Sequence, residues 1–404
     1  MPGIQGCGPL VPELLPPDRQ PVIIAARRTP VCPVNGALRS LRAHELLAPV
    51  LRELVSELAL DPASVSDVVI GNAVGGGGNV ARLALLEAGL PVSIPGITVD
   101  RQCGSGLDAI VMAGRLVAAG GSPVYLAGGV ESTSTAPLRA HRTDDGDPDF
   151  YRRAQFVPES FGDPDMGVAA ETVAQEYGVG RERQDTFALA SHRKALAAIR
   201  DGRFEDELVP LETTAGPVSS DGGPRAGLTP AVMARFPAAF VPGGTVTAGN
   251  SCFDADGASA VVITSLARAR QVGARDGLLV RGTGTAGVAP RVLGMGAVPA
   301  ANDVLASAGI PAGELDLVEF NEAFASQTLA CLDQAGIDAD RANLDGGALA
   351  LGHAYGASGA VLVTRLLAQA RRTGNPGALA LAMISMAGGM GTAALLEYRL
   401  LGSR

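Results

Sequence analysis

An internal repeat constrains the fold of this 404-residue chain more than any other feature. An offset of 249 residues carries the run SDVVIGN at 66–72 onto LDLVEFN at 315–321. An offset of 253 carries Ser-Gly at 105–106 onto Ser-Gly at 358–359, each at the start of a helix-like run. Two ordered matches at nearly the same offset indicate a duplicated α/β unit. Its copies should pack as related halves, and a site at their junction can draw on loops from both.

The pattern of apolar residues divides the chain into four parts. Strand-like and helix-like runs alternate up to residue 135 and return from residue 245, which is typical of an α/β unit. The stretch between them is polar, rich in proline and glycine and poor in strand signals, so we expect an inserted loop domain. The expected parts are an N-terminal arm (1–20), a first half (21–135 and 245–275), the loop domain (136–244) and a second half (276–404).

Composition argues against several classes of protein. The net charge is −9 and no basic run occurs, so nucleic acid is not an expected partner. No apolar stretch is long enough to span a membrane, and the first twenty residues lack the regions of a signal peptide. The five cysteines are widely spaced, and no two histidines have the spacing of metal ligands. We therefore expect a cytoplasmic protein with no membrane span and no metal site.

Cys103 is the candidate nucleophile. It stands between an apolar run and a helix-like run that begins at Gly104. We expect its thiol at a helix N-terminus, where backbone N–H groups and the helix dipole lower the pKa of a cysteine from about 8.5. Gly104 and Gly106 leave room for a substrate carbonyl beside the backbone. The alternative for this residue is a small buried cysteine on a tight turn.

Three stretches of the second half favour a catalytic role of Cys103 over a structural one. Asn321 follows a strand-like run, where its amide can fix a water or a carbonyl, although a helix cap is the plainer alternative. His353 lies in a glycine-rich turn before a helix-like run. Ser385 ends a strand-like run, and the glycines after it expose backbone N–H groups that suit an oxyanion hole.

The chain resembles the thiolases over nearly its whole length, from about residue 21 to residue 398. The matching motifs occur in the family's order: AARRTPV, CGSGL, GGVEST, MGVAAE, GGTVTAGN, NEAFASQ, GGALALGH with GASGA, and GGMG. The resemblance implies two βαβαβαββ halves in a five-layered αβαβα sandwich, with a loop domain inserted in the first half. This implied fold agrees with the repeat and with the inserted segment.

The resemblance also implies roles for single residues. Cys103 corresponds to the nucleophile that takes an acyl group as a thioester, and His353 to the histidine that activates it. Asn321 corresponds to the residue that positions a water, and it forms one oxyanion hole with His353. The backbone N–H groups of Cys103 and Ala387 correspond to the second hole. The substrate implied is a thioester of coenzyme A or of an acyl carrier protein, with no resident cofactor.

Further positions correspond to residues along the path of coenzyme A. Arg225 resembles a loop-domain residue near the nucleotide end. Cys252 and Phe253 stand where the family commonly has serine and glycine along the pantetheine channel, and the larger Phe253 is expected to narrow that channel. The other expected substrate-binding residues are Met166, Ala323 and Phe324.

Ser385 departs from the family, which has a second cysteine there as the acid and base for the α-proton. A serine hydroxyl has a pKa several units above the value of about 8.5 for a thiol, so it is a poor match for this proton transfer. We expect an acyltransferase that makes or cleaves a carbon–carbon bond between acyl thioesters. Two alternatives stay open: acyl transfer, hydrolysis or decarboxylative condensation without that base, and a silent binding partner. The segment 136–166 looks shorter than in tetrameric thiolases, which favours a homodimer over a tetramer.

Overall fold

The computed structural model describes residues 15–120 and 124–402, so most of the predicted N-terminal arm lies outside the described residues. The main strands hydrogen-bond in the order β12-β13-β14-β11-β1-β10-β5-β3-β4, with the short β2 beside β10. β1 (Pro21–Arg28) and β11 (Asp276–Gly287) lie side by side at the centre of this order and join through two antiparallel residue pairs. The sheet therefore has two parts that meet at one narrow contact.

The first half follows the expected alternation of strands and helices. After β1 come β2 (Cys32–Pro33), α1 (Ala43–Glu57), β3 (Asp67–Gly71), α2 (Val80–Glu87), β4 (Gly96–Val99), α3 (Ser105–Ala118), β5 (Val124–Ser132) and, later, β10 (Ala255–Ser265) and α7 (Leu266–Gln271). β3 pairs parallel with β4 and β5, whereas β10 pairs antiparallel with β1 and β5. β5 and β10 are buried along their whole length, as expected for strands covered on both faces.

The second half repeats this topology. It contains β11, α8 (Ala297–Ala308), β12 (Leu317–Phe320), α9 (Ala325–Ala335), α10 (Ala348–Leu351), α11 (Tyr355–Thr373), β13 (Leu379–Met386) and β14 (Met390–Leu400). The order β11-β14-β13-β12 corresponds to β1-β10-β5-β3, with the same parallel and antiparallel pairings. In the place of β4, the described residues form a single parallel bridge between Val318 and Ala342. The predicted duplication is thus confirmed.

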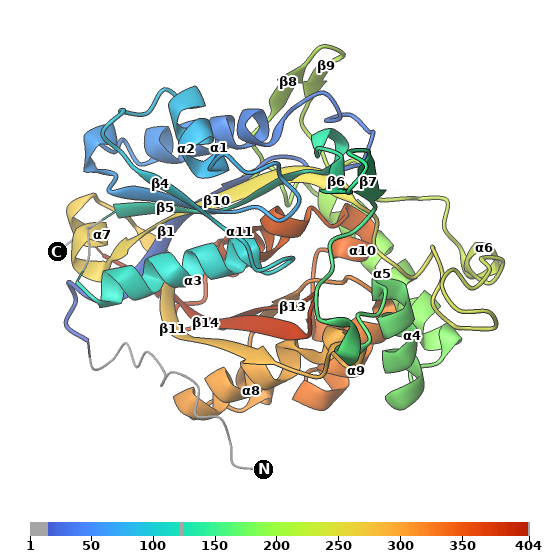
Figure 1. Cartoon of the computed structure of the whole chain (residues 1–404). Coiled ribbons are helices and arrows are strands. Elements are labelled where there is room, and N and C mark those ends of the chain that lie inside the picture. Colours follow the sequence, from blue (N-terminus) through green and yellow to red (C-terminus); the bar gives the residue numbers. More distant parts are fainter. Residues whose placement is uncertain (1–14, 121–123, 403–404) are drawn as a thin grey trace.

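The helices and the sheet stack as five layers in Figure 1. Helices α1 and α2 cover the strands of the first half, α3 and α11 fill the middle, and α8 and α9 cover the strands of the second half. One cluster of buried apolar side chains occupies each of the three helix-covered regions. α11 is buried on nearly every side, which fits a helix between two sheets. The αβαβα sandwich expected from the sequence is confirmed.

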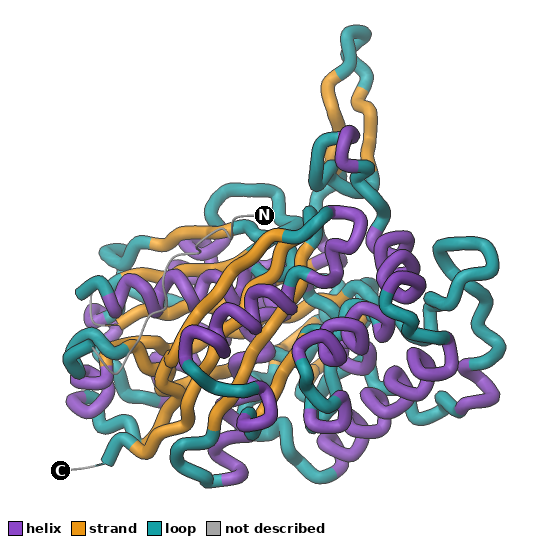
Figure 2. The backbone as a smooth tube through the Cα atoms, turned by 90° about the horizontal axis from the view of Figure 1, so that it is seen from below, coloured by secondary structure: helices purple, strands orange, loops and turns teal. Residues whose placement is uncertain are grey.

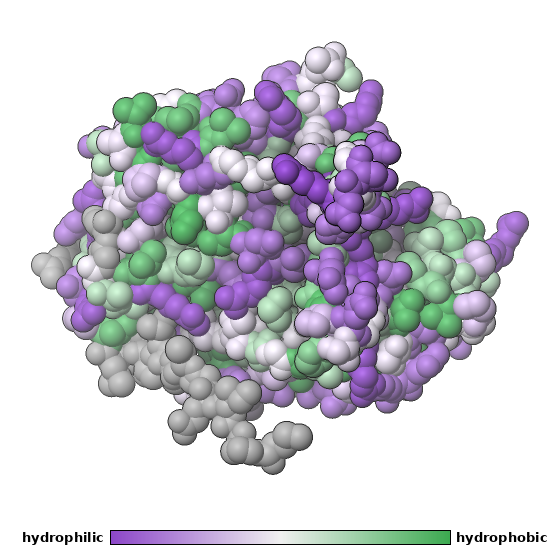
Figure 3. Space-filling model, viewed as in Figure 1, coloured by the Kyte–Doolittle hydropathy of each residue, from purple (hydrophilic) through white to green (hydrophobic). Residues whose placement is uncertain are grey.

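The chain between β5 and β10 leaves the sheet. Its elements are β6 (Arg139–Arg142), β7 (Pro148–Tyr151), α4 (Met166–Glu176), α5 (Arg181–Arg200), β8 (Leu211–Thr213), β9 (Gly216–Val218) and α6 (Pro230–Met233). β6 and β7 form a hairpin that projects from the body in Figure 2. Figure 3 shows hydrophilic side chains over this hairpin and hydrophobic ones around α6. α4 and α5 pack against α9, so this segment also contacts the second half.

None of the helices in the described ranges combines the length and the hydropathy that a membrane span requires.

Candidate active site

Cys103 lies on a tightly held turn directly before α3. Gln102 has a left-handed backbone with φ of 50°. The Ser105 hydroxyl donates to the Gln102 carbonyl at 2.6 Å and accepts the N–H of Arg101 at 2.9 Å. Backbone strain of this kind persists only where the surrounding structure enforces it. The turn therefore presents the Cys103 side chain in one orientation at the start of the helix.

Burial controls the protonation of Cys103. It raises the pKa of the thiol to about 12 and outweighs the backbone N–H groups of Ala387 and Cys103, whose hydrogen bonds to the sulfur lower that pKa. The lowered pKa predicted from the helix N-terminus is therefore wrong. That prediction considered only the local backbone, whereas desolvation depends on the whole fold. Cys103 is a neutral thiol at pH 7 and needs a base to become a nucleophile.

His353 has the features of that base. Its Nδ1 lies 2.7 Å from the Ser358 hydroxyl, and its Nε2 is buried with no hydrogen-bond partner among the described residues. Burial lowers the pKa of His353 to about 4, so the imidazole is neutral at pH 7. When Nδ1 carries the proton and donates it to Ser358, the lone pair of Nε2 is free to accept another proton.

One cavity of about 390 Å³ brings most of the predicted site residues together. Both halves of the chain and α4 contribute to its wall. The predicted residues that line it are Cys103, His353, Ser385, Ala387, Cys252, Met166, Ala323 and Phe324. The sequence analysis missed Asp254 and Tyr355, which line the same cavity. The sequence could have indicated them, because a charged residue stands within the motif GNSCFDADGA and an aromatic residue within GHAYGASGA.

Three predicted residues are not among those that line this cavity. Asn321 borders a neighbouring cavity of about 20 Å³ together with Ser358. Its Nδ2 is buried and has no hydrogen-bond partner in the described part of the chain. The Arg225 guanidinium lies 5.8 Å from the centroid of the Phe253 ring. Phe253 thus packs against Arg225, and the narrowing of the substrate channel expected at Phe253 stays a prediction.

Backbone groups hold the Ser385 hydroxyl. It donates to the Gly294 carbonyl at 2.6 Å and accepts the N–H of Ala297 at 3.1 Å. The thiol of Cys331 also donates to the Gly294 carbonyl, at 3.2 Å. Burial raises the pKa of Cys331 to about 12, so this thiol is neutral. These bonds join β13 to the start of α8, and they occupy both the proton and a lone pair of Ser385.

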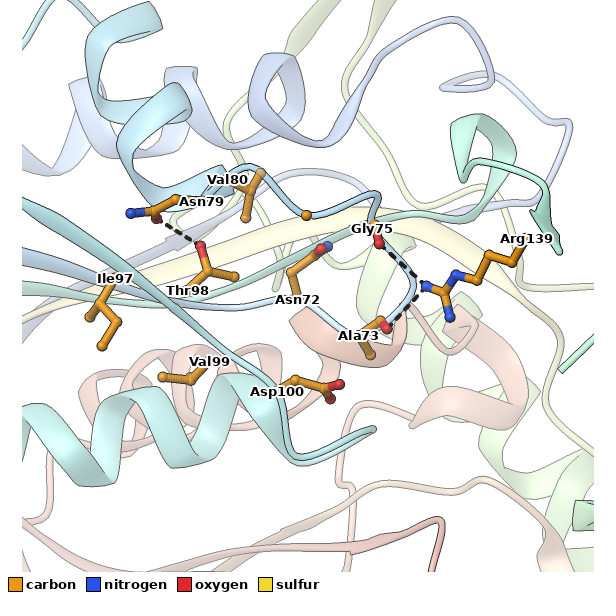
Figure 4. A pocket seen from close by; sticks show the side chains of 11 residues that line it. Asn72, Ala73, Gly75, Asn79, Val80, Ile97, Thr98, Val99, Asp100 and Arg139 are labelled. Atoms are coloured by element: carbon orange, nitrogen blue, oxygen red, sulfur yellow. Dashed lines mark hydrogen bonds between the residues drawn. The ribbon is translucent and has the colours of Figure 1, made fainter. Parts of the chain in front are cut away.

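Two further hollows continue from Cys103 toward the edge of the sheet. A cavity of about 670 Å³ shares Cys103 and Ala387 with the first one and extends beneath β6 and β7. A hollow of about 540 Å³ along β4 shares Asp100 and Arg139 with the second. In Figure 4, Arg139 reaches from β6 to the carbonyls after β3, with Nη2 3.4 Å from the oxygen of Ala73. This contact fixes the base of the hairpin to the loop between β3 and α2.

Comparison with known proteins assigns the family. Residues 21–267 match the thiolase N-terminal domain, and residues 278–398 match the thiolase C-terminal domain. The chain belongs to the thiolase family. The two matched ranges together cover most of the sequence and follow the two halves of the sheet.

Proteins that are similar to this thiolase over nearly its whole length support the assignment to the family. The protein named "Putative acetyl-CoA C-acetyltransferase VraB" of Staphylococcus epidermidis is 42% identical over 383 residues, 94% of this chain and 98% of that protein. The protein of the same name in Staphylococcus haemolyticus is 43% identical, with 94% and 99% covered. The crystal structure of the Bacillus anthracis acetyl-CoA acetyltransferase has a TM-score of 0.86 at 33% identity, with 94% and 99% covered. The fold implied by the resemblance is therefore found in a solved structure.

Proposed function

We propose that this thiolase transfers acyl groups between coenzyme A thioesters through an acyl-Cys103 intermediate, and makes or cleaves the carbon–carbon bond of a 3-ketoacyl-CoA. The observation that carries the proposal is the surroundings of the Cys103 sulfur, where the backbone N–H groups of Cys103 and Ala387 lower the pKa of the thiol. Those two groups suit the oxygen of a bound acyl group, and the sulfur shares its cavity with the neutral His353.

Acylation of Cys103 is the first half of the proposed reaction. His353 takes the thiol proton on Nε2, and the sulfur attacks the carbonyl carbon of the bound thioester. The N–H groups of Cys103 and Ala387 hold the oxygen while it carries negative charge. The bond to the sulfur of coenzyme A then breaks, and His353 returns its proton to the leaving thiolate.

Carbon–carbon bond formation is the second half. A second acyl-CoA loses an α-proton, and its α-carbon attacks the acyl-Cys103 carbonyl. The bond to the Cys103 sulfur breaks, and a 3-ketoacyl-CoA leaves. We propose that His353 turns to its other neutral tautomer in this half, with the proton on Nε2 and the Ser358 hydroxyl donating to Nδ1. Nε2 of His353 and Nδ2 of Asn321, both buried without partners among the described residues, then stabilise the enolate oxygen of the second substrate. Thiolysis is the same sequence in reverse.

The proposal also includes the acyl donor, the oligomeric state, the localisation and the absence of a resident cofactor. The names of the relatives refer to acetyl-CoA, which supports a coenzyme A thioester over an acyl carrier protein. A homodimer in the cytoplasm, with no resident cofactor, stays a prediction. Light scattering of the purified protein, fractionation of cells and a metal and cofactor assay of the purified protein test these three points.

The mass of the intact protein after mixing with a panel of acyl-CoAs tests the acylation step. We expect a mass increase of one acyl group, absent in Cys103→Ala and present in Cys252→Ala, which removes the other thiol of the cavity. A second acyl-CoA should then yield a 3-ketoacyl-CoA. An adduct without this product would favour acyl transfer or hydrolysis, and no adduct with any donor would contradict the proposal.

A further inference from the structure

The cavity of Cys103 contains a carboxylate and a phenol for which the proposed reaction has given no role. Asp254 precedes β10, and Tyr355 is the first residue of α11. The Tyr355 hydroxyl donates to Oδ1 of Asp254 at 2.5 Å, and both residues line the cavity. Asp254 is solvent-exposed, and no other hydrogen bond to its carboxylate occurs among the described residues. Its second oxygen is thus available to a substrate.

The backbone places Asp254 beside His353. The two residues form a parallel β-bridge, in which the His353 N–H donates to the Phe253 carbonyl at 2.9 Å and the Ala255 N–H donates to the His353 carbonyl at 3.2 Å. Residues paired in this way direct their side chains to the same face. The Asp254 carboxylate therefore lies on the same side of the bridge as the imidazole.

Tyr355 completes this group of side chains. Its ring packs against the His353 ring edge-on, with centroids 5.0 Å apart. Its φ of 20° is unusual for a tyrosine, and strained residues of this kind cluster at functional sites. Burial and the charge of Asp254 raise the pKa of Tyr355, so the phenol keeps its proton and donates it. Tyr355 thereby orients the carboxylate toward the cavity.

The Ser385 hydroxyl, the other candidate proton acceptor in this cavity, is less suited than Asp254 to remove a proton. The proton and a lone pair of the Ser385 hydroxyl are engaged by Gly294 and Ala297. A hydroxyl is also a weak base at neutral pH, whereas carboxylates serve as general bases. The other carboxylate that lines the cavity, Asp165, is paired with Arg153 at 2.7 Å. Among the described residues that line this cavity, Asp254 is the carboxylate that forms no ion pair.

We propose that Asp254, oriented by Tyr355, is the general base that removes the α-proton of the attacking acyl-CoA, an inference that rests on the proposed function. The C–H bond breaks, the proton moves to Oδ2 of Asp254, and the electron pair forms the enolate. The α-carbon then bonds to the carbonyl carbon of acyl-Cys103 as the bond to sulfur breaks. In thiolysis Asp254 returns the proton to the departing acyl-CoA.

Exchange of the α-protons of acetyl-CoA in D₂O, followed by mass spectrometry, tests this role separately from acylation. We expect Asp254→Asn to form acyl-Cys103 within about threefold of the wild-type rate and to lose exchange and condensation by roughly 10²- to 10⁴-fold. Asp254→Glu, which keeps a carboxylate, should retain part of the exchange. Tyr355→Phe should lower exchange by about tenfold, since one orienting hydrogen bond is lost.

Two matched variants make the outcome decisive. Asp165→Asn removes the paired carboxylate of the same cavity, and we expect exchange within about threefold of wild type, as for a surface ion pair. Ser385→Ala should lower exchange far less than Asp254→Asn, and Ser385→Cys should bring no gain.

Three results would overturn the inference. Wild-type exchange in Asp254→Asn with intact acylation would exclude Asp254 as the base and leave the proposed function standing. Loss of exchange in Ser385→Ala but not in Asp254→Asn would assign the proton transfer to Ser385. No acyl adduct on the wild-type protein would overturn the proposed function and this inference together.

Discussion

Gly106 and Gly359 occupy equivalent positions in the two halves, 253 residues apart, and each lies where the backbone of the other half passes. A Cβ on Gly106 would lie 2.5 Å from the Gly356 carbonyl oxygen, and one on Gly359 would lie 2.6 Å from the backbone nitrogen of Leu107. Side chains at these points would separate α3 from α11. The repeated Ser-Gly pair thus marks the close contact that unites the halves in the central layer.

Gly359→Ala should destabilise the protein by about 1–3 kcal/mol. Alanine is the better helix former, so a loss of stability would show that the backbone of Leu107 leaves no room. The midpoint of urea unfolding measures the effect. Gly313→Ala is the control, because a Cβ there meets nothing within 4 Å and the backbone has no left-handed φ. Equal midpoints for the two variants would contradict the close contact.

His353→Asn should slow acylation of Cys103 by roughly 10²- to 10⁴-fold at pH 7, because the neutral thiol then has no base. The rate of adduct formation by intact mass is the measurement. His141→Asn serves as the control, since His141 is exposed on the β6–β7 hairpin. Acylation of His353→Asn at the wild-type rate would remove His353 from the mechanism.

The acylation rate should be nearly constant between pH 8 and about pH 5.5. Burial lowers the pKa of His353 to about 4, so the imidazole stays neutral through this range. An ordinary histidine, with a pKa of about 6.5, would lose its base form within it. The rate of acylation, measured in quenched reactions between pH 5.5 and pH 8, tests this prediction. A half-maximal rate near pH 6.5 would show that the imidazole titrates normally.

Ser358→Ala should slow acylation by about tenfold, since a hydrogen bond of about 1–1.5 kcal/mol no longer fixes the ring and tautomer of His353. Ser358→Thr keeps a hydroxyl and should restore most of the rate. Both variants should fold normally, as judged from their urea midpoints. If Ser358→Ala and Ser358→Thr acylate equally fast, the bond to Nδ1 has no part in positioning the base.

The architecture could be predicted from the sequence, because helices and strands follow from the local periodicity of apolar residues and the two halves from the internal repeat. The offsets of 249 and 253 residues pointed to two equivalent halves, and the strand pairings repeat accordingly. The protonation of Cys103 could not be predicted in this way. Its position before α3 indicated a lowered pKa, but burial by residues distant in sequence raises that pKa instead. Desolvation is a property of the folded chain.

Contacts between distant loops were also beyond prediction. Asp254 and Tyr355 lie 101 residues apart, and neither belongs to a spacing that indicates a pair. Arg225 and Phe253 are both expected along the path of the substrate, and the sequence did not indicate that the Arg225 guanidinium lies over the Phe253 ring. In both pairs the contact depends on how separate loops meet in the folded chain, which no local pattern encodes.

Glu319→Gln should make stability less dependent on pH. Glu319 lies fully buried on β12, and burial raises its pKa to about 8 despite the attraction of Arg365 and a hydrogen bond from Gln369. Because this pKa exceeds the value of about 4.5 of the unfolded chain, the group's stabilising contribution is complete below pH 4.5. This contribution decreases as the pH rises from 4.5 and is fully lost once the pH has passed the folded pKa of about 8. The variant should therefore gain stability relative to wild type between pH 5 and pH 9, by an amount on the order of 4 kcal/mol. Urea midpoints at both pH values measure this gain, with the exposed Glu314→Gln as control, and a constant difference from wild type would show that Glu319 is ionised throughout.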